Sequence, residues 1–214
     1  MTPALVQAPS ASSAARDGRN GRNDRDDQQV TEWALAARSG DREAVEHFIR
    51  ATRSDVWRYV AHLSADVHGA DDLTQETYLR ALTGLAGFQA RSCARAWLLS
   101  IARRVVVDRY RSAAARPRTA DASDWQAAAE RAQPPGLPGF EEGVALRELL
   151  ETLDAPRRQA FVLTQLLGLP YADAATAVGC PIGTVRSRVA RARQDLTALL
   201  LAAQTAGEPL PLAG

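Results

Sequence analysis

The sequence predicts an all-α protein with two small helical domains joined by a flexible linker. Apolar residues recur at three- and four-residue spacing over residues 30–112 and again over residues 141–203, which is typical of amphipathic helices. Residues 113–140 lack this pattern and form the linker. Proline and glycine interrupt it at Pro117, Pro134, Pro135, Gly136, Pro138 and Gly139. Residues 1–29 are expected to be a disordered N-terminal tail, and residues 204–214 a loose C-terminal tail.

The charge of the chain is distributed unevenly. The 214 residues carry a net charge of +1, but residues 88–118 contain eight arginines and one acid and therefore carry +7. The remainder must then carry −6. All 26 basic residues are arginine, which suits bidentate contacts with phosphates and bases. This segregation suggests nucleic-acid surfaces and a separate acidic surface for another partner. We hypothesise that the opposite charges let the free protein fold back on itself and mask its nucleic-acid sites.

The sequence disfavours several kinds of site and location. Cys93 and Cys180 form no CxxC pair, so isolated structural cysteines are expected rather than a disulfide framework or a thiolate zinc site. His47, His62 and His68 lack metal-ligand spacing, and we expect ordinary histidines, no metal and no cofactor. No apolar run approaches membrane-spanning length and no signal-peptide pattern opens the chain, so we expect a cytoplasmic protein with no membrane partner.

The first domain opens with two predicted helices. One carries Trp33 and Ala36 and stops at Ser39-Gly40. Asp41 is a candidate N-cap for the second, longer helix. Apolar residues at helical spacing follow at Ala44, Val45, Phe48, Ile49, Val56, Tyr59, Val60 and Leu63.

A third predicted helix follows Gly69 and carries a polar face. Asp72, Gln75 and Glu76 stand at i, i+3 and i+4 and therefore share one side of that helix. A catalytic role is disfavoured because the sequence shows no metal-ligand partner, no nucleophile beside them and no glycine-rich phosphate loop. An acidic docking face or a plain solvated surface is the better interpretation.

A loop over residues 87–93 leads into a basic helix over residues 94–111 with two stripes. The stripe expected to be buried contains Leu98, Ile101, Ala102 and Val105. The second stripe contains Trp97, Ser100, Arg104, Asp108 and Arg111. An aromatic ring among arginines is the arrangement that binds single-stranded nucleic acid, by base stacking and phosphate neutralisation. Trp97 could equally complete the core, and the sequence leaves both interpretations open.

The second domain ends in a helix-turn-helix pattern. Helices are expected over residues 144–153, ending before Pro156, and over residues 160–167. A short amphipathic helix then ends at Gly179, which can adopt a left-handed conformation, and Pro181 suits the first turn of the next helix. That helix buries a stripe at Val185, Val189, Ala192 and Leu196. Off the stripe lie Thr184, Arg186, Ser187, Arg188 and Arg191.

This second helix has the features of a DNA-reading helix. The alternative is a solvated helical hairpin kept soluble by its arginines. Four arginines and no acid between Cys180 and Gln194 favour DNA binding.

Three segments in the same order and spacing resemble a known family. They are residues 72–77 (DLTQET), 96–103 (AWLLSIAR) and 168–193. These segments resemble blocks of the extracytoplasmic-function group of bacterial sigma factors, the specificity subunits of RNA polymerase, and in particular its actinobacterial members. The resemblance covers residues 30–112 and 141–203 and implies a sigma region 2-like helical bundle and a sigma region 4-like helix-turn-helix domain.

The resemblance also assigns partners and residues. It implies that Asp72, Gln75 and Glu76 hold the clamp helices of the largest polymerase subunit. It further implies a flap region of polymerase, promoter DNA and an anti-sigma factor as candidate partners. The resemblance implies that the loop and the basic helix melt and capture the −10 element, through Arg91, Arg95, Trp97, Arg103, Arg104, Asp108 and Arg111. It also implies that the second helix of the helix-turn-helix recognises the −35 element, through Thr184, Arg186, Ser187, Arg188 and Arg191. The family often has asparagine where this chain has Arg104, which affects the expected −10 preference.

Three other functions are weaker interpretations. A conventional dimeric helix-turn-helix regulator would leave Trp97, the basic helix and the Asp72 face unexplained. A protein-binding adaptor would leave the arginine-rich surfaces unexplained. A nucleic-acid enzyme lacks any catalytic constellation in the sequence, so no catalytic residue is expected.

Overall fold

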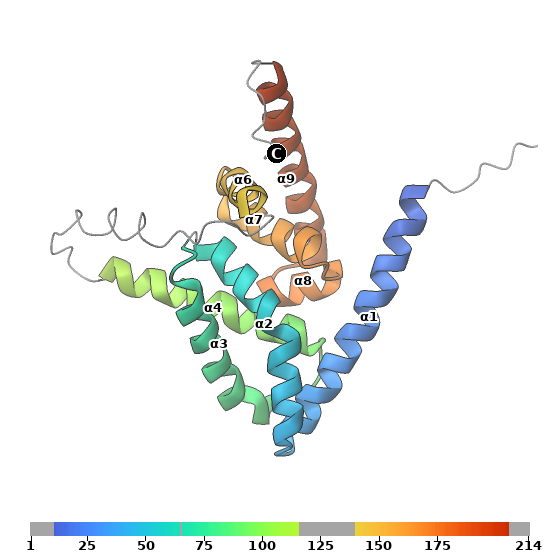
Figure 1. Cartoon of the computed structure of the whole chain (residues 1–214), viewed down its shortest axis with the longest axis vertical. Helices are drawn as coiled ribbons and strands as arrows, with labels where there is room; N and C mark the ends of the chain where they lie inside the picture. The colour runs from blue at the N-terminus through green and yellow to red at the C-terminus, as the bar shows by residue number, and fades with distance from the viewer. Residues whose placement is uncertain (1–10, 65, 116–139, 206–214) are drawn as a thin grey trace, which may run out of the picture.

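Every regular element in the part of the chain that the structure describes is helical, as predicted (Figure 1). The computed structural model describes residues 11–64, 66–115 and 140–205. The elements are α1 (Ala11–Arg38), α2 (Arg42–Ser64), α3 (Ala70–Gly84), η1 (Leu85–Gly87), α4 (Ala94–Ala115), α6 (Phe140–Glu151), α7 (Ala155–Phe161), η2 (Val162–Leu166), α8 (Tyr171–Val178) and α9 (Ile182–Thr205). Most of the predicted linker and C-terminal tail lies outside the described residues.

Helices α1 to α4 form the first domain around α2, which packs against the other three. Phe48, Val56 and Tyr59 of α2 are fully buried, as the apolar spacing predicts. The predicted N-cap is confirmed, because the Asp41 carboxylate accepts a 3.1 Å hydrogen bond from the Ala44 amide. These contacts fix the position of α4, which carries most of the predicted −10 residues.

The N-terminal tail differs from the prediction. Residues 1–29 were expected to be disordered, but α1 begins at Ala11 and runs to Arg38. The helix is anchored by polar groups that a search for apolar periodicity does not detect. Asp27 is only 5% exposed, and Thr31 accepts a 3.0 Å hydrogen bond from the Ala94 amide, capping the start of α4. Gly40, with a φ of 95°, makes the turn into α2.

Helices α6 to α9 form the second domain. Asp154 caps α7 by accepting a 2.8 Å bond from the Arg157 amide, and Pro156 fits the first turn, where no amide partner is needed. The predicted helix over residues 160–167 is instead the end of α7 and the π-helical turn η2. Gly179 ends α8 with φ 70° and ψ 42°, the predicted left-handed conformation.

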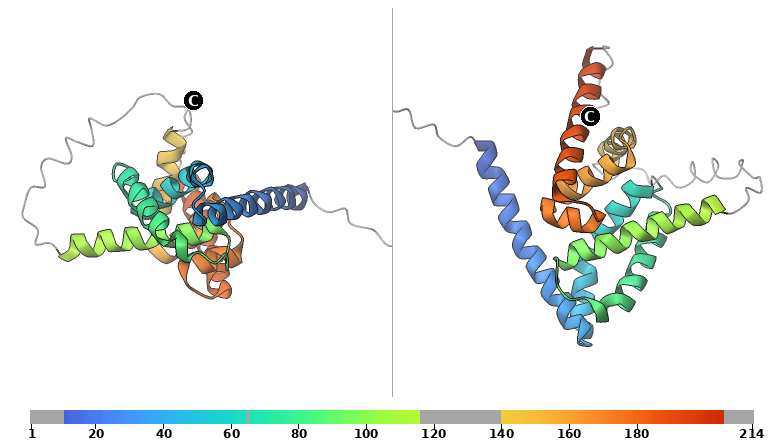
Figure 2. Two further views of the ribbon diagram at one scale, coloured as in Figure 1. Left: turned by 90° about the horizontal axis from the view of Figure 1, so that it is seen from below. Right: turned by 180° about the vertical axis from the view of Figure 1, so that it is seen from behind.

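The two domains lie against each other. Helix α8 packs on α4, and α7 and η2 contact α2. The buried apolar residues form one cluster that extends from Val30 in α1 to Ala192 in α9. Figures 1 and 2 show that the N-terminal end of α1 and the C-terminal part of α9 project from this body. The helix-turn-helix is thus held beside the basic helix.

Replacing Gly179 should reveal the strain that the turn between α8 and α9 imposes on any other residue. We expect Gly179→Ala to lower the free energy of unfolding by about 1 kcal/mol or more, because alanine is strained at φ 70°. Urea denaturation of the full chain measures this. Gly183→Ala is the matched control: the site is helical with nothing within 4 Å of an added Cβ, so equal or slightly higher stability is expected. Equal effects of both substitutions would contradict the left-handed conformation assigned to residue 179.

Candidate nucleic-acid interface

Helix α4 buries the stripe that the sequence predicts and exposes parts of the second stripe. Leu98, Ala102 and Val105 are at most 2% exposed, and Ile101 is partly buried. Trp97 is also partly buried. Its ring packs against that of Phe88, with the two ring centroids 4.9 Å apart and the ring planes tilted by 42°. The core interpretation of Trp97 is confirmed in part, since the ring packs on the core, and its edge that lines a surface cavity leaves the strand-binding interpretation a prediction. We call the second stripe, Trp97, Ser100, Arg104, Asp108 and Arg111, the strand face.

The cavity beside Trp97 lies in the loop before α4. It has a volume of about 270 Å³ and is lined by Gly87, Phe88, Gln89, Arg91, Ser92 and Trp97. The loop is held from α1, because Arg38 donates a 2.8 Å hydrogen bond to the Phe88 carbonyl. Ala90 has a φ of 51°, a left-handed conformation that alanine rarely adopts. A fixed loop with an aromatic wall and an arginine is suited to holding one flat, partly charged group.

Arg95 does not lie with the other predicted strand-binding residues. It is 8% exposed and forms ion pairs with Asp55 at 2.7 Å and with Asp27 at 3.2 Å. It also donates to the carbonyl of Leu167, which follows η2 in the second domain. We call this group the Arg95 cluster. The sequence did not predict this arrangement, because the partners lie 40 to 72 residues away and no local pattern points to them.

Asp27 has only part of its charge compensated in the Arg95 cluster. Its Oδ1 accepts from Arg95, while its Oδ2 is buried without a hydrogen-bond partner among the described residues. Burial raises the pKa of Asp27 above its ordinary 3.8, while the guanidinium of Arg95 opposes the rise. Removing Arg95 would leave the buried carboxylate of Asp27 without its ion-pair partner, which typically costs about 3–5 kcal/mol.

A second polar contact joins the domains near Arg103. Gln159 of α7 donates a 3.0 Å hydrogen bond to the hydroxyl of Tyr59 on α2, and its carbonyl accepts from Arg103 at 3.4 Å. Tyr59 is fully buried, which raises the pKa of its hydroxyl. Arg103, predicted to bind DNA, is therefore half-buried and engaged by the second domain in this conformation.

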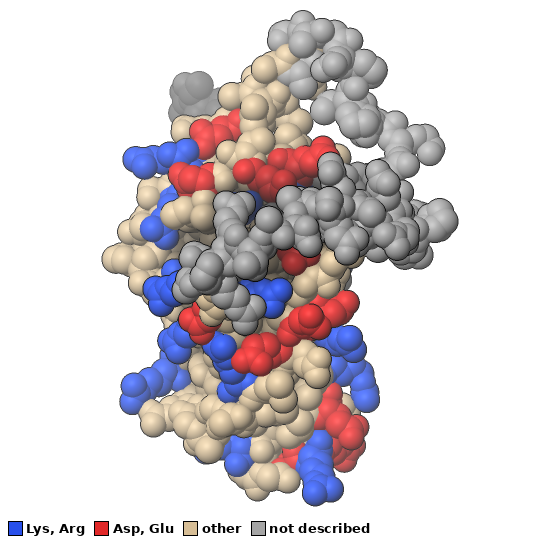
Figure 3. Space-filling view, turned by 90° about the vertical axis from the view of Figure 1, so that its left-hand side faces the viewer, with Lys and Arg blue, Asp and Glu red and all other residues tan. Residues whose placement is uncertain are grey.

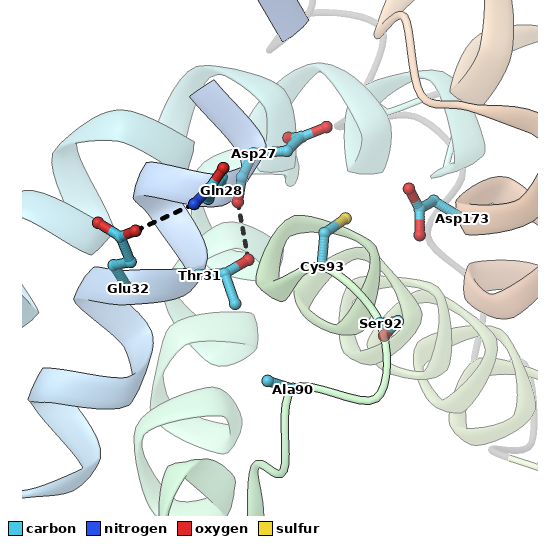
Figure 4. A pocket seen from close by; sticks show the side chains of 8 residues that line it. All are labelled: Asp27, Gln28, Thr31, Glu32, Ala90, Ser92, Cys93 and Asp173. Carbon is cyan, nitrogen blue, oxygen red and sulfur yellow. Dashed lines mark hydrogen bonds between the residues drawn. The ribbon is translucent and has the colours of Figure 1, made fainter. Parts of the chain in front are cut away.

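The junction of the domains also contains a cavity of about 400 Å³ (Figure 4). Asp27 from α1, Cys93 from the loop and Asp173 from α8 line it. Burial raises the pKa of the Cys93 thiol to about 12, so it stays neutral and poorly reactive at physiological pH. Its sulfur accepts a 3.4 Å hydrogen bond from the Ala96 amide at the start of α4. These observations agree with the expected structural role of this cysteine.

The remaining strand-binding candidates are on the surface. Arg91, Arg104 and Arg111 are exposed. Asp108 is partly exposed and forms a 2.6 Å ion pair with Arg80 of α3, which sequence reasoning missed. The i, i+4 spacing of Glu76 and Arg80 in the sequence is a signal for the ion pair between those two residues, but it does not point to Asp108. Figure 3 shows arginines and acids interspersed on one face of the molecule.

The polar face of α3 borders a cavity of about 500 Å³. Asp72 and Gln75 are exposed and line it with Ile49, Arg53, Asp71, Thr74, Tyr78, Leu79 and Leu82. Leu79 and Leu82 are 57% and 38% exposed and lie near each other on the same helix face. Glu76 lies outside this cavity and pairs with Arg80 at 2.8 Å. The structure thus combines an apolar depression with a rim of carboxylates and amides.

The reading helix of the helix-turn-helix presents its predicted residues together. Val185, Val189 and Ala192 are buried, and Leu196 is partly buried, so the other side of α9 faces solvent. Arg186, Ser187 and Arg191 are exposed, while Thr184 and Arg188 are partly exposed. Arg188 also donates a 3.6 Å hydrogen bond to the sulfur of Cys180.

Over residues 11–64, 66–115 and 140–205, the structure contains no group of three or more His, Cys, Asp or Glu side chains that could hold a metal ion. In these same ranges no helix combines the length and apolar character needed to cross a membrane.

Comparison with known proteins identifies both domains. Sigma-70 region 2 matches residues 48–116, and sigma-70 region 4 matches residues 143–196. The ECF RNA polymerase sigma factor SigC of Mycobacterium tuberculosis is 51% identical over 178 residues, covering 80% of this chain and 91% of that protein. The chain therefore belongs to the extracytoplasmic-function (ECF) RNA polymerase sigma factors of the sigma-70 family.

Solved structures agree with this assignment. The structure of CnrH in complex with the cytosolic domain of CnrY has 25% sequence identity and a TM-score of 0.61, covering 81% of this chain and 98% of that one. The sigma factor RpoE in complex with the anti-sigma factor NepR from Bartonella quintana has 26% identity and a TM-score of 0.56, covering 73% of this chain and 96% of that one. A conventional helix-turn-helix regulator would account for the region 4 match alone.

Proposed function

We propose that this sigma factor uses three surfaces to direct transcription initiation in the cytoplasm. The α3 cavity binds core polymerase, the loop before α4 and the strand face capture the −10 element, and α9 reads the −35 element. The cavity between Phe88 and Trp97 carries the proposal, because a conventional duplex-binding regulator has no use for it. The three surfaces also come from three separate parts of one chain, as a subunit that joins polymerase to two promoter elements requires.

Capture of the −10 element requires bases to leave the duplex stack. Flipping one base costs a few kcal/mol. Stacking on an aromatic ring recovers about 1–3 kcal/mol per base, and arginines neutralise the adjoining phosphates. Trp97 and Arg91 supply these groups in the same cavity, and Arg104 and Arg111 continue the strand face along α4. The strained backbone at Ala90 fits a loop fixed in shape before the strand arrives.

Docking on polymerase requires a stable protein–protein contact on α3. The exposed Leu79 and Leu82 offer apolar area, and Asp72 and Gln75 at the rim offer polar selectivity. The cavity of about 500 Å³ suits an apolar side chain from a partner helix, surrounded by basic residues that pair with the rim.

Reading of the −35 element fits the exposed side of α9. A helix in the major groove places its N-terminal side chains at base edges, and arginine binds guanine in a bidentate manner. Arg186 and Arg188 lie in the first two turns of α9, where such contacts form.

We further propose that the observed packing of the domains is a closed state. The −35 and −10 elements are about 25 base pairs apart, or about 85 Å along the duplex. In the closed state α9 packs on α8, and α8 packs on α4, so their axes are only about two helix diameters apart, roughly 20 Å. One molecule therefore cannot occupy both elements until the contacts of Leu167 and Gln159 with the first domain break. Those contacts engage Arg95 and Arg103, both predicted to bind the −10 strand.

An anti-sigma factor is proposed as a further partner. One of the solved relatives is described as bound to an anti-sigma factor, and a partner that favours the closed state would keep both DNA-binding surfaces of this chain from acting together.

In vitro transcription with purified core polymerase on a genomic DNA library tests the proposal. New, defined start sites should appear only when this protein is added. Asp72→Arg should weaken core binding by roughly tenfold and remove those starts, because it reverses a charge at the rim of the α3 cavity. Thr83→Arg adds a charge to the same helix outside that cavity and should leave both unchanged. Altered output from existing promoters, with no new starts, would support a conventional regulator instead.

Arginine substitutions in α9 should separate base reading from general charge. Arg186→Ala and Arg188→Ala should each weaken binding to the −35 element by about 1–3 kcal/mol and relax its base preference. Arg193→Ala is the matched control, since Arg193 donates a 2.5 Å hydrogen bond to Gln165 in η2. It should weaken binding uniformly across sequences if it has any effect. Unchanged −35 preference in the first two variants, measured by binding to a randomised element, would remove their assignment.

The closed state should weaken in mild acid through His62. Its Nδ1 is buried without a hydrogen-bond partner in the described structure, and burial lowers the pKa of His62 below its ordinary 6.5, with Arg147, Arg58 and Arg158 lowering it further. Arg147 and Arg158 belong to the second domain, so the open state binds the proton more readily. The contribution of neutral His62 to closure is therefore complete above pH 6.5, and it is lost as the pH falls from 6.5 to the lowered pKa of the closed state.

Small-angle scattering from pH 7.5 to 5.5 measures this opening. His62→Gln should flatten the pH dependence, whereas His68→Gln, at an exposed histidine, should leave it unchanged. The same expansion in His62→Gln as in the unaltered protein would assign the effect to another group.

A further inference from the structure

Arg80 connects two surfaces that the proposed function treats as separate. It lies on α3, and its Nε is 2.8 Å from Glu76 Oε1, next to the polymerase-docking cavity. Its Nη1 is 2.6 Å from Asp108 Oδ2 on the strand face of α4. All three side chains remain between 41% and 46% exposed. Exposed pairs of this kind contribute little to folding stability, so a role in stability alone is a weak explanation for the arrangement.

Asp108 presents a problem for a surface that holds a nucleic-acid strand. It is the one acid among the eight arginines of residues 88–118, and it lies between Arg104 and Arg111 on the strand face. An uncompensated carboxylate there repels the phosphates that the neighbouring arginines attract. Carboxylates can nevertheless serve such a surface, because they accept hydrogen bonds from exocyclic amino groups of bases.

The contact with Arg80 resolves this conflict. Because Arg80 pairs with Oδ2, the local charge is compensated and the orientation of the carboxylate is fixed. The other oxygen, Oδ1, has no hydrogen-bond partner within the described ranges, and it is available to an outside donor. A paired carboxylate with one available oxygen is a selective acceptor for an amino group.

We propose that Arg80 is a positioning residue of the −10 surface: it neutralises and orients Asp108 so that Asp108 accepts a hydrogen bond from an amino-bearing base of the unpaired strand. The ligand class is a base with an exocyclic amino group, namely adenine, cytosine or guanine rather than thymine. The inference rests on the proposed capture of the −10 strand by α4. Arg80 acts through Asp108 and does not itself contact the base.

Binding of the holoenzyme to a promoter with a pre-melted −10 bubble tests this inference. Bubbles with each base at each non-template position are compared for the unaltered protein, Arg80→Ala, Asp108→Asn and the double variant. Arg80→Ala should weaken bubble binding roughly 2- to 5-fold at low salt. The loss should shrink at high salt because exposed charges are screened. Adding Asp108→Asn should restore binding to near the unaltered level, since the repulsive charge is gone, but should not restore the preference for an amino-bearing base at one position.

Two controls make the result specific. Arg109→Ala removes an exposed arginine that follows Asp108 but faces another side of α4, so its coupling with Asp108→Asn should be weaker than that of Arg80→Ala. Arg80→Lys keeps the charge and should retain most of the binding. Core affinity, measured separately, should be the same for all variants.

The inference would be overturned by full binding of Arg80→Ala, by no rescue on adding Asp108→Asn, or by the absence of a base preference that depends on Asp108. A loss of core affinity in Arg80→Ala would place Arg80 in the docking surface instead and would also overturn it. Failure of the proposed function has a different signature, because the unaltered holoenzyme would then bind the bubble no better than core polymerase alone.

Discussion

The buried guanidinium of Arg95 is the interaction on which the arrangement of this sigma factor depends. It joins Asp27 of α1, Asp55 of α2 and the Leu167 carbonyl beyond η2, so one side chain ties together both domains. A charge so enclosed is tolerated only while its partners stay in place. Apolar contacts between α4 and α8 supply area, but the Arg95 cluster specifies how the second domain sits on the first.

This constraint makes α4 a shared element. One side of the helix fills the core through Leu98 and Val105, another offers Arg104 and Arg111 to solvent, and a third engages the second domain through Arg95 and Arg103. The helix cannot use all its arginines for DNA while the domains remain packed. In the proposed function, closure and promoter binding compete for the same side chains, and any ligand that prefers one state shifts the other. On this proposal, binding to polymerase and promoter supplies the energy for opening.

The sequence predicted the helices, caps and turns that depend on neighbouring residues, and it missed the contacts between residues far apart in the chain. Apolar spacing identified the helical domains, and Gly179 and Asp41 were predicted correctly because caps and left-handed turns depend on one or two residues. Arg95 was assigned to the −10 surface through the family resemblance of its helix. Its burial depends on Asp27, in a segment whose polar composition suggested disorder. A charged residue that holds a helix in place by an ion pair adds nothing to the apolar periodicity by which helices are recognised in a sequence. The assignments of the docking, −10 and −35 residues remain proposals, since exposure alone does not identify what a surface binds.

The most direct measurement of the central claim is the distance between spin labels on the two domains. Labels at exposed positions Thr83 on α3 and Gln194 on α9, in a background where Cys180 is replaced by serine, report closure by pulsed electron resonance. Cys93 should not be labelled, because burial raises the pKa of its thiol to about 12. The account predicts one narrow distance in the free protein and a shift to a longer distance in the complex with core polymerase and promoter. An unchanged distance in a transcribing complex would contradict it, as would a broad distribution in the free protein.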